Sequence, residues 1–484
     1  MSRQLLPLIL GMNNKVGSSK KRNLTCAGVV RTPLPTGDAP PVAIITLCLI
    51  ACFLTMSCGR TKPPEDERRP NVILVSIDSL RADHVHGYGY GPETTPVLDE
   101  LMRRGTAFSN CISHAPWTLP VQVSLFTSLY PHSHGVIDKG FALNEDVLTL
   151  PVALKNAGYA TGGFACLPYH DPDYGFGRGF DTYVCKKMKD FHAPDIFEES
   201  LKWLLQLGSS RFFLFLHTYD VHASYNPPEH YLKMFETSYD GHIDGSLTTL
   251  LDIRHERIVL SDEDLRHLVA LYDAGIREFD HDIGVFLKFL KEKDFLANTI
   301  VIVTADHGDE FLEHGGSFHG RTLYDEMLKV PLIMAGPGIP VGKMIEEQVQ
   351  VIDIMPTILE LCGSEIPSGI EGKSLLPLIK QEVADWEQFA FAEADAEKKV
   401  KDIYRVVRAG RYKLIYDRLT GREELYDLAL DPYEQVNIIE DKPEIAETLR
   451  QKLREWMVTE RGNPATVKIS EKQKNEIRAL GYLN

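Results

Sequence analysis

The stretch NVILVSI at Asn71–Ile77 decides the fold. Its apolar, β-branched character is typical of a strand buried on both faces of a parallel sheet. Runs of the same kind follow at residues 212–216 (FFLFL) and 299–304 (TIVIVT). Helical patterns at residues 95–104 and 265–293 alternate with these runs. We therefore expect an α/β fold with a mainly parallel central sheet flanked by helices.

The chain changes character near residues 379–386. Beyond this point, residues 405–416 (RVVRAGRYKLIY) predict two short strands around a glycine turn. Residues 441–457 predict a helix that begins with a D-x-x-E capping pattern. These shifts indicate a large domain over residues 70–380 and a small C-terminal α+β domain over residues 385–484.

The composition is that of an ordinary globular protein, with 44% hydrophobic and 25% charged residues among 484. Its 52 lysines and arginines are outnumbered by 68 acidic residues, which gives a formal net charge of −16. Because basic residues are not in excess, we do not expect nucleic-acid binding. An acidic balance still permits an anionic substrate, since bound metal ions reverse the local field of a site.

The N-terminal region contains an apolar run, VAIITLCLIACFLTM at residues 42–56. This run is shorter than the ~20 residues of a membrane span and suits the core of a signal peptide. Ser57 and Cys58 follow it, which resembles a bacterial lipoprotein signal with Cys58 as the lipidated mature N-terminus. An uncleaved anchor helix is the alternative. Either interpretation predicts a membrane-anchored cell-envelope protein that faces the periplasm or exterior, with residues 1–58 as its N-terminal segment and residues 59–69 as a linker.

Residue types that bind metals follow all three strand runs. They are Asp78 after the first, His217, Asp220 and His222 after the second, and Asp306, His307 and Asp309 after the third. A single Asp after a strand is more often a helix cap or turn residue, and a lone His is more often structural. The carboxyl ends of parallel strands meet at one edge of the sheet, however, so the coincidence of three favours a metal site.

Thr118 is the candidate nucleophile, in the stretch TLPVQ at residues 118–122. Pro120 favours the first turn of a helix, so Thr118 is expected at or just before a helix N-terminus. There the helix dipole and a bound metal would stabilise an alkoxide. The alternative is that Thr118 only caps the helix.

Several ordered segments of the chain resemble the sulfatase family within the alkaline phosphatase superfamily. They are residues 71–89, 118–136, 215–228, 303–315, 319–334 and 424–438. The resemblance covers nearly all of the chain from residue 70 to residue 484. It implies an alkaline-phosphatase-like large domain and a small C-terminal domain.

The resemblance also implies one divalent metal, usually calcium, held by Asp78, Asp306 and His307. The family's nucleophile is a formylglycine made from the Cys or Ser of a C/S-x-P-x-R motif. In this chain Thr118 occupies that position and Gln122 replaces the Arg, while Ser79 replaces the second Asp of an Asp-Asp pair. Threonine cannot become formylglycine, so an ordinary formylglycine mechanism is in doubt.

A Thr or Ser at this position resembles the phosphate-cleaving relatives, which bind two metals. A second ion would be held by Asp220, His222 and His319. Asp and imidazole ligands would then favour zinc or manganese over calcium. His222 and His319 also match positions that contact the substrate in sulfatases, so a one-metal site remains the alternative to the favoured two-metal site. For Asp309, Glu310 and His314, which share the DHGDEFLEHG run, we expect structural or supporting roles.

We therefore expect a metal-dependent hydrolase of sulfate or phosphate esters, with Thr118 as nucleophile and His222 or His319 beside the leaving oxygen. The substrate would be an anionic ester of a glycan, lipid or nucleotide. Alternatives within the superfamily are a phosphodiesterase, a phosphonate monoester hydrolase or a phospho-group transferase. A catalytically dead binding module is disfavoured because the expected ligands Asp78 and Asp306 are intact.

Overall fold

A computed structural model describes residues 69–187, 191–383, 385–386, 389–395, 403–458 and 462–479. From Pro70 onward the chain forms one compact unit. Cys58 and the apolar run before it lie outside the described residues, so the lipoprotein and anchor hypotheses stay predictions. Within the described part of the chain, no helix is long and apolar enough to cross a membrane.

The three predicted strands lie side by side at the centre of a nine-stranded sheet. β1 (Asn71–Ile77) pairs in parallel with β6 (Phe212–Thr218) on one side and β7 (Thr299–Ala305) on the other. The strand order is β11-β2-β10-β7-β1-β6-β4-β5, and β12 pairs with β2. The remaining strands of this sheet are β2 (Thr106–Ile112), β4 (Ala160–Leu167), β5 (Thr182–Lys187), β10 (Lys329–Ala335), β11 (Lys343–Ile345) and β12 (Val349–Gln350).

Only β10 runs antiparallel to its neighbours β7 and β2, so the mainly parallel sheet predicted from the sequence is confirmed. Every residue of β6 and of β7 is buried, as the continuous apolar runs predict for strands covered on both faces.

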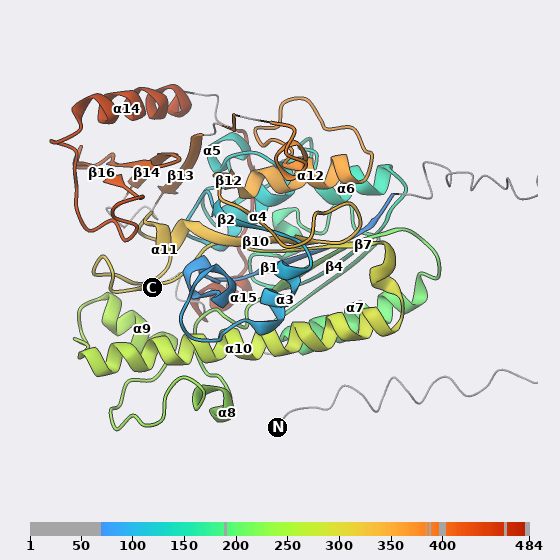
Figure 1. Cartoon of the computed structure of the whole chain (residues 1–484), viewed down its shortest axis with the longest axis horizontal. Coiled ribbons are helices and arrows are strands. Elements are labelled where there is room, and N and C mark those ends of the chain that lie inside the picture. Colours follow the sequence, from blue (N-terminus) through green and yellow to red (C-terminus); the bar gives the residue numbers. More distant parts are fainter. Residues whose placement is uncertain are drawn as a thin grey trace, which may run out of the picture. The chain divides into compact units, whose positions relative to one another are not determined.

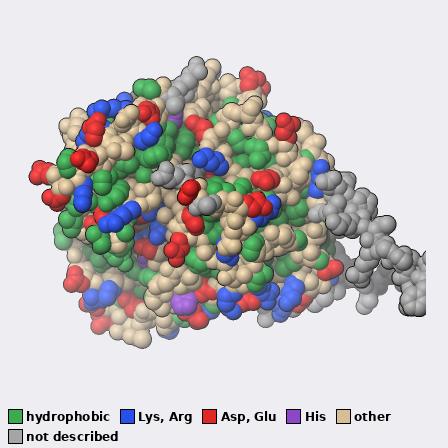
Figure 2. Space-filling view, turned by 45° about the horizontal axis from the view of Figure 1, so that its top comes forward, with side chains coloured by type: hydrophobic (Ala, Val, Ile, Leu, Met, Phe, Trp, Pro, Cys, Tyr) green, Lys and Arg blue, Asp and Glu red, His purple; other side chains and the backbone are tan. Residues whose placement is uncertain are grey.

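Helices cover both faces of this sheet (Figure 1). On one face lie α4 (Thr118–Thr127), α6 (Leu150–Asn156) and α12 (Ile354–Leu361), and on the other α3 (Pro96–Arg103), α7 (Ala193–Gln206) and α10 (Asp262–Glu292). Helix α10 begins three residues before the predicted start because Ser261 and Asp264 form a capping box there. On the face in Figure 2, acidic and basic side chains are interspersed among hydrophobic ones.

Shorter elements complete this part of the chain. They are α5 (Pro131–His134), α8 (Glu229–Leu232), α9 (Leu247–Arg254), α11 (Asp325–Leu328), α13 (Leu376–Ile379) and α15 (Glu471–Ala479), with β3 (Phe141–Ala142) paired to β17 (Ala465–Thr466) and β8 (Glu310–Phe311) to β9 (Ser317–Phe318).

The C-terminal part contains a second, antiparallel sheet. Its order is β13 (Phe389–Asp395), β14 (Ile403–Ala409), β15 (Tyr412–Asp417) and β16 (Glu423–Asp427), and α14 (Pro443–Met457) packs on it. The predicted D-x-x-E cap of this helix is wrong. Lys442 is the N-cap residue and Pro443 takes the first helical position, which suits its fixed φ.

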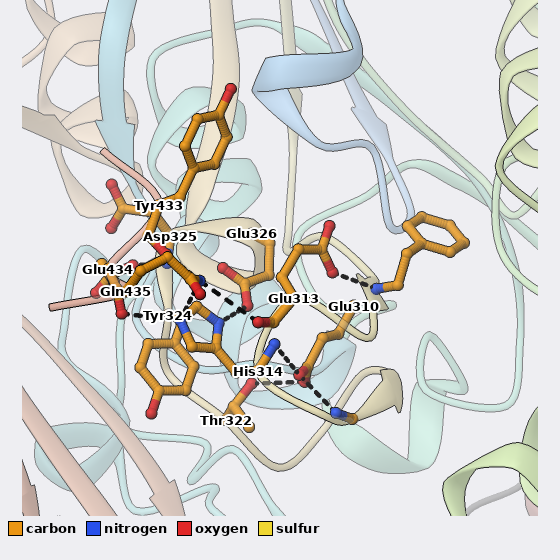
Figure 3. A network of polar contacts seen from close by, with 12 residues as sticks. Glu310, Glu313, His314, Thr322, Tyr324, Asp325, Glu326, Tyr433, Glu434 and Gln435 are labelled. Atoms are coloured by element: carbon orange, nitrogen blue, oxygen red, sulfur yellow. Dashed lines mark hydrogen bonds and ion pairs between the residues drawn. The ribbon is translucent and has the colours of Figure 1, made fainter. Parts of the chain in front are cut away.

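Buried ion pairs connect the second sheet to the segment before β10. Lys413 of β15 is fully buried, and its Nζ lies 2.9 Å from Asp325 Oδ1 and 2.8 Å from Glu434 Oε1. His314 provides a second link, because its ring lies between Glu326 and the backbone of Glu434 (Figure 3).

Candidate active site

The candidate site lies at the carboxyl ends of two central strands and at the start of one helix. Asp78 directly follows β1, Asp306 and His307 follow β7, and Thr118 is the first residue of α4. All four side chains are at most 1% exposed. The ligand atoms of Asp78, Asp306 and His307 lie within 4.8 Å of one another. The chain therefore brings together the residues that the sequence analysis grouped around one metal.

The Thr118 hydroxyl faces this group. It donates a hydrogen bond to Asp78 Oδ2 at 3.1 Å and lies 3.4 Å from His307 Nε2. His307 Nε2 in turn lies 3.7 Å from Asp78 Oδ1 and 3.7 Å from Asp306 Oδ2. These spacings leave Thr118 in contact with the residues that would hold an ion.

The electrostatics of the site suit a cation. Burial and the nearby Asp306 raise the pKa of Asp78 well above its usual range. Burial alone would also raise the pKa of Asp306, but His307 and His217 lower it. Two buried carboxyl groups this close repel one another when both are ionised, and a divalent cation between them relieves that repulsion.

Two residues that depart from the family pattern contact the same carboxylates. The Ser79 hydroxyl donates to Asp78 Oδ1 at 2.8 Å, and the Ser79 amide donates to Asp306 Oδ1 at 3.2 Å. Gln122 Nε2 donates to Ser76 Oγ at 2.7 Å and lies 3.5 Å from Asp306 Oδ2. Both side chains therefore help to orient the candidate ligands.

A second group of possible ligands adjoins the first. His307, Asp309 and His319 also have ligand atoms within 4.8 Å of one another. Asp309 binds the ring of His319 through one oxygen and accepts the Tyr225 hydroxyl on the other. His222 lies nearby, with its ring centroid 4.9 Å from that of His319. Burial and His319 lower the pKa of His222 to about 3, so this imidazole is neutral.

Asp220 differs from the expectation for a second ion. Its carboxylate accepts the amide of Ala193 at 2.9 Å and lies 3.5 Å from His192 Nδ1, at the N-terminus of α7. The free amides of a helix start attract a carboxylate. Among the described residues, Asp309 rather than Asp220 is grouped with His319.

Two further buried histidines lie here: the sequence placed His217 among the metal-binding residue types after the second strand run without assigning it to an ion, and it gave His170 no role. His217 lies within β6, where its Nε2 is 3.8 Å from Asp78 Oδ2 and 3.8 Å from Asp306 Oδ2. The ring of His170 lies 4.0 Å from that of His217. His217 had a signal in the sequence, since it directly follows FFLFL. His170 had none, because it stands in a turn far away along the chain.

The residues present fit a divalent ion. Two buried carboxylates and an imidazole converge. His217 Nε2 lies 3.8 Å from both carboxylates and has no hydrogen-bond partner among the described residues. Oxygen and nitrogen donors of this kind bind divalent metals.

Known proteins are similar in sequence to this chain along most of its length. The model of the sulfatase family matches residues 70–364, and that of the C-terminal part of N-sulphoglucosamine sulphohydrolase matches residues 313–461. Arylsulfatase K of Mus musculus is 25% identical over 469 residues, which cover 84% of this chain and 84% of that protein. N-acetylglucosamine-6-O-sulfatase of Bacteroides thetaiotaomicron is 25% identical over 488 residues, 81% and 87% of the two chains.

Solved structures share the fold. A structure in complex with its substrate D-glucosamine-2-N,6-O-disulfate has a TM-score of 0.68 at 22% identity and covers 80% of this chain and 97% of that one. Phosphonate monoester hydrolase of Agrobacterium radiobacter has a TM-score of 0.68 at 20% identity, with 84% and 99% covered. The chain thus belongs to the sulfatase family and is, as the sequence predicted, a sulfuric or phosphoric ester hydrolase.

Proposed function

We propose that the protein is a metal-dependent hydrolase of sulfate or phosphate esters in which the Thr118 hydroxyl is the nucleophile. The observation that carries this proposal is the contact of Thr118 Oγ1 with Asp78 and His307, at 3.1 and 3.4 Å. A hydroxyl placed against candidate metal ligands is the arrangement that activates a Thr for attack on phosphorus or sulfur.

The capping alternative for Thr118 has less support. Trp117 is the N-cap residue of α4, and Thr118 already has the first helical position. The described side chains make no capping hydrogen bond at this helix start. Because the Thr118 hydroxyl donates to a carboxylate instead of accepting a free amide, its removal should leave the helix end as it is.

In the proposed mechanism, Asp78, Asp306 and His307 would hold the ion. When bound, it would lower the pKa of the attacking hydroxyl and neutralise the non-bridging oxygens of the ester. Thr118 Oγ1 attacks phosphorus or sulfur in line as the bond from that atom to the leaving oxygen breaks, and the hydroxyl proton passes to the adjacent Asp78 carboxylate. The leaving oxygen departs as the alcohol after taking up a proton, and water then cleaves the Thr118 ester and regenerates the hydroxyl. Neutral His222 and His319 lie beside the site, where they would bind the ester oxygens or hold a proton near the leaving oxygen.

Two substrate classes have support: sulfate esters of sugars, and phosphodiesters or phosphonate monoesters. Sulfated sugars are favoured by the relatives named for glucosamine sulfatase activity. A phosphodiester or phosphonate monoester is favoured by Thr118 itself and by the adjoining group of His307, Asp309 and His319, which offers a place for a second ion. We further propose that the protein works at the cell envelope, attached through Cys58 or its N-terminal segment.

Two substitutions of Thr118 test the nucleophile. Thr118→Val keeps the side-chain shape without the hydroxyl, so turnover should fall by at least roughly 1,000-fold. Thr118→Ser keeps the oxygen and should retain part of the activity. The measurement is steady-state kinetics with nitrophenyl sulfate, phosphate and phosphodiester substrates, together with the metal content of each variant.

Thr127→Val is the matched control, because Thr127 is equally buried in the same helix and its hydroxyl donates to the backbone of Val123 at 2.8 Å. This variant should turn over substrate at a near-wild-type rate. Near-wild-type turnover by folded, metal-loaded Thr118→Val would contradict the proposal. The ratio of sulfate to phosphate turnover in the wild-type protein then distinguishes the two substrate classes.

A further inference from the structure

His217 lies beneath the candidate metal ligands, on the strand next to the one that ends at Asp78. In the sheet it pairs with Ser76 of β1, and Ser76 pairs on its other side with Thr304 of β7. The His217 side chain is fully buried, and its Nε2 is equally distant, at 3.8 Å, from one oxygen of Asp78 and one of Asp306. The ring is therefore aimed at the gap between the two carboxylates.

The ring nitrogens of His217 are buried without hydrogen bonds to any of the described residues. Buried His134 differs in this respect, because it accepts the amide of Val136 at 3.0 Å and has its Nε2 3.2 Å from Pro120 O. A buried polar group without a partner is costly, so such a group calls for an explanation.

The distances from His217 Nε2 to the two carboxylates suggest an explanation for the missing hydrogen bonds. A separation of 3.8 Å is too long for a hydrogen bond. With metal–ligand bonds of about 2.0–2.4 Å, two ligands of one ion lie roughly 3–4 Å apart. The contacts of His217 with both carboxylates fall in that range, as do the 3.7 Å contacts of His307.

We infer that His217 is a further ligand of the ion that Asp78, Asp306 and His307 would hold. The inference deepens the proposed function and rests on the metal site in it. His307 approaches Asp78 on the side of Oδ1, whereas His217 approaches it on the side of Oδ2, and both face Oδ2 of Asp306. Two imidazoles and two carboxylates favour zinc or manganese over calcium, which prefers oxygen ligands only.

Neighbouring rings hold His217 in this orientation. His170 packs against it at 4.0 Å between ring centroids with a tilt of 39°, and Tyr219 meets it edge-on at 5.0 Å. A ring packed on two sides is pre-oriented for a ligand, because little side-chain entropy remains to be lost on binding. We assign His170 the role of positioning His217.

Metal binding by full-length variants tests the inference. His217→Phe keeps the ring and removes both nitrogens, so the affinity for Zn²⁺ or Mn²⁺, measured by calorimetry, should fall by at least about tenfold. His170→Phe is the matched control, since it keeps the stacking and should bind either ion as the wild type does. If His217 were instead an imidazolium that neutralises the carboxylates, its removal would leave the affinity unchanged or raise it. That result, or an equal loss in both variants, would overturn the inference.

A spectroscopic variant covers the case in which His217→Phe fails to fold. In the Co²⁺-loaded protein, His217→Cys should give a thiolate-to-cobalt charge-transfer band that the wild type and His170→Cys lack. The absence of this band in a Co²⁺-containing His217→Cys protein would refute ligation at this position. If the wild type itself binds no divalent ion, the metal-dependent function fails as a whole; if only the His217 results are negative, the proposed function stands without this ligand.

Discussion

His314 offers a test of how the two sheets are joined, because its ionisation is coupled to the fold. Its Nδ1 lies 2.6 Å from Glu326 Oε1 and its Nε2 lies 3.1 Å from the backbone oxygen of Glu434 (Figure 3). Both nitrogens face acceptors, so the ring donates at both and carries a positive charge. This arrangement leaves no lone pair for a metal in the group formed by Glu310, His314 and Glu326.

The pKa of His314 sets the size of the effect. Burial lowers this pKa, but the Glu326 carboxylate outweighs burial and raises it from 6.5 to about 9. At about 1.4 kcal/mol for each pH unit, the shift corresponds to a stabilisation on the order of 3 kcal/mol. Because the folded-state pKa is the higher one, this stabilisation is complete below about pH 6.5 and is lost as the pH rises through about 9.

The assay is urea unfolding of the wild type and His314→Gln at about pH 6 and about pH 10. The variant should lose on the order of 3 kcal/mol of unfolding free energy at the lower pH and much less at the higher one. His281→Gln is the control, since the His281 side chain is 56% exposed and its pair with Asp282 is worth little. An equal loss for His314→Gln at both pH values would refute the reasoning.

Three other variants test separate parts of the molecule. Asp306→Ala combined with His307→Ala should abolish metal binding and turnover together, and a double variant with full metal content would contradict the site. Cys58→Ala should release the protein from the membrane fraction or block its maturation, whereas continued palmitate labelling would exclude lipidation at Cys58. Lys413→Met removes the 2.8 Å partner of buried Glu434 and one of two cationic partners of Asp325, which keeps Arg408 at 3.1 Å, so it should destabilise the fold by about 3 kcal/mol. An unchanged thermal midpoint would show that this ion pair contributes nothing net.

Much of the large sheet was predictable from local pattern. β1 has the bounds expected from NVILVSI, while β6 and β7 extend past the apolar runs by two residues and one residue. The extension of β6 includes His217, a polar residue that hydrophobicity places outside the strand. Its membership in β6 depends on pairing with β1, a long-range contact that no local pattern contains.

The sequence predicted the site residues that directly follow strands, but it did not predict how the side chains in loops are placed. Asp78, Asp306 and His307 follow adjacent parallel strands, so topology alone brings them together. Asp220 and Asp309 stand in loops, where side-chain direction depends on distant partners. The start of α7 binds the Asp220 carboxylate, and Tyr225 and His319 bind Asp309.

The departures from the family pattern make physical sense when taken together. Relative to that pattern, Ser79 removes one negative charge and Gln122 removes one positive charge, so the formal charge around the ion is unchanged. Both replacement side chains donate to the candidate ligands, the Ser79 hydroxyl to Asp78 at 2.8 Å and Gln122 Nε2 to Asp306 at 3.5 Å. What changes is the donor chemistry, because one carboxylate is lost while the imidazole of His217 faces the same gap. In the proposed mechanism, an ion held by this donor set would lie beside Thr118 and lower the pKa of its hydroxyl.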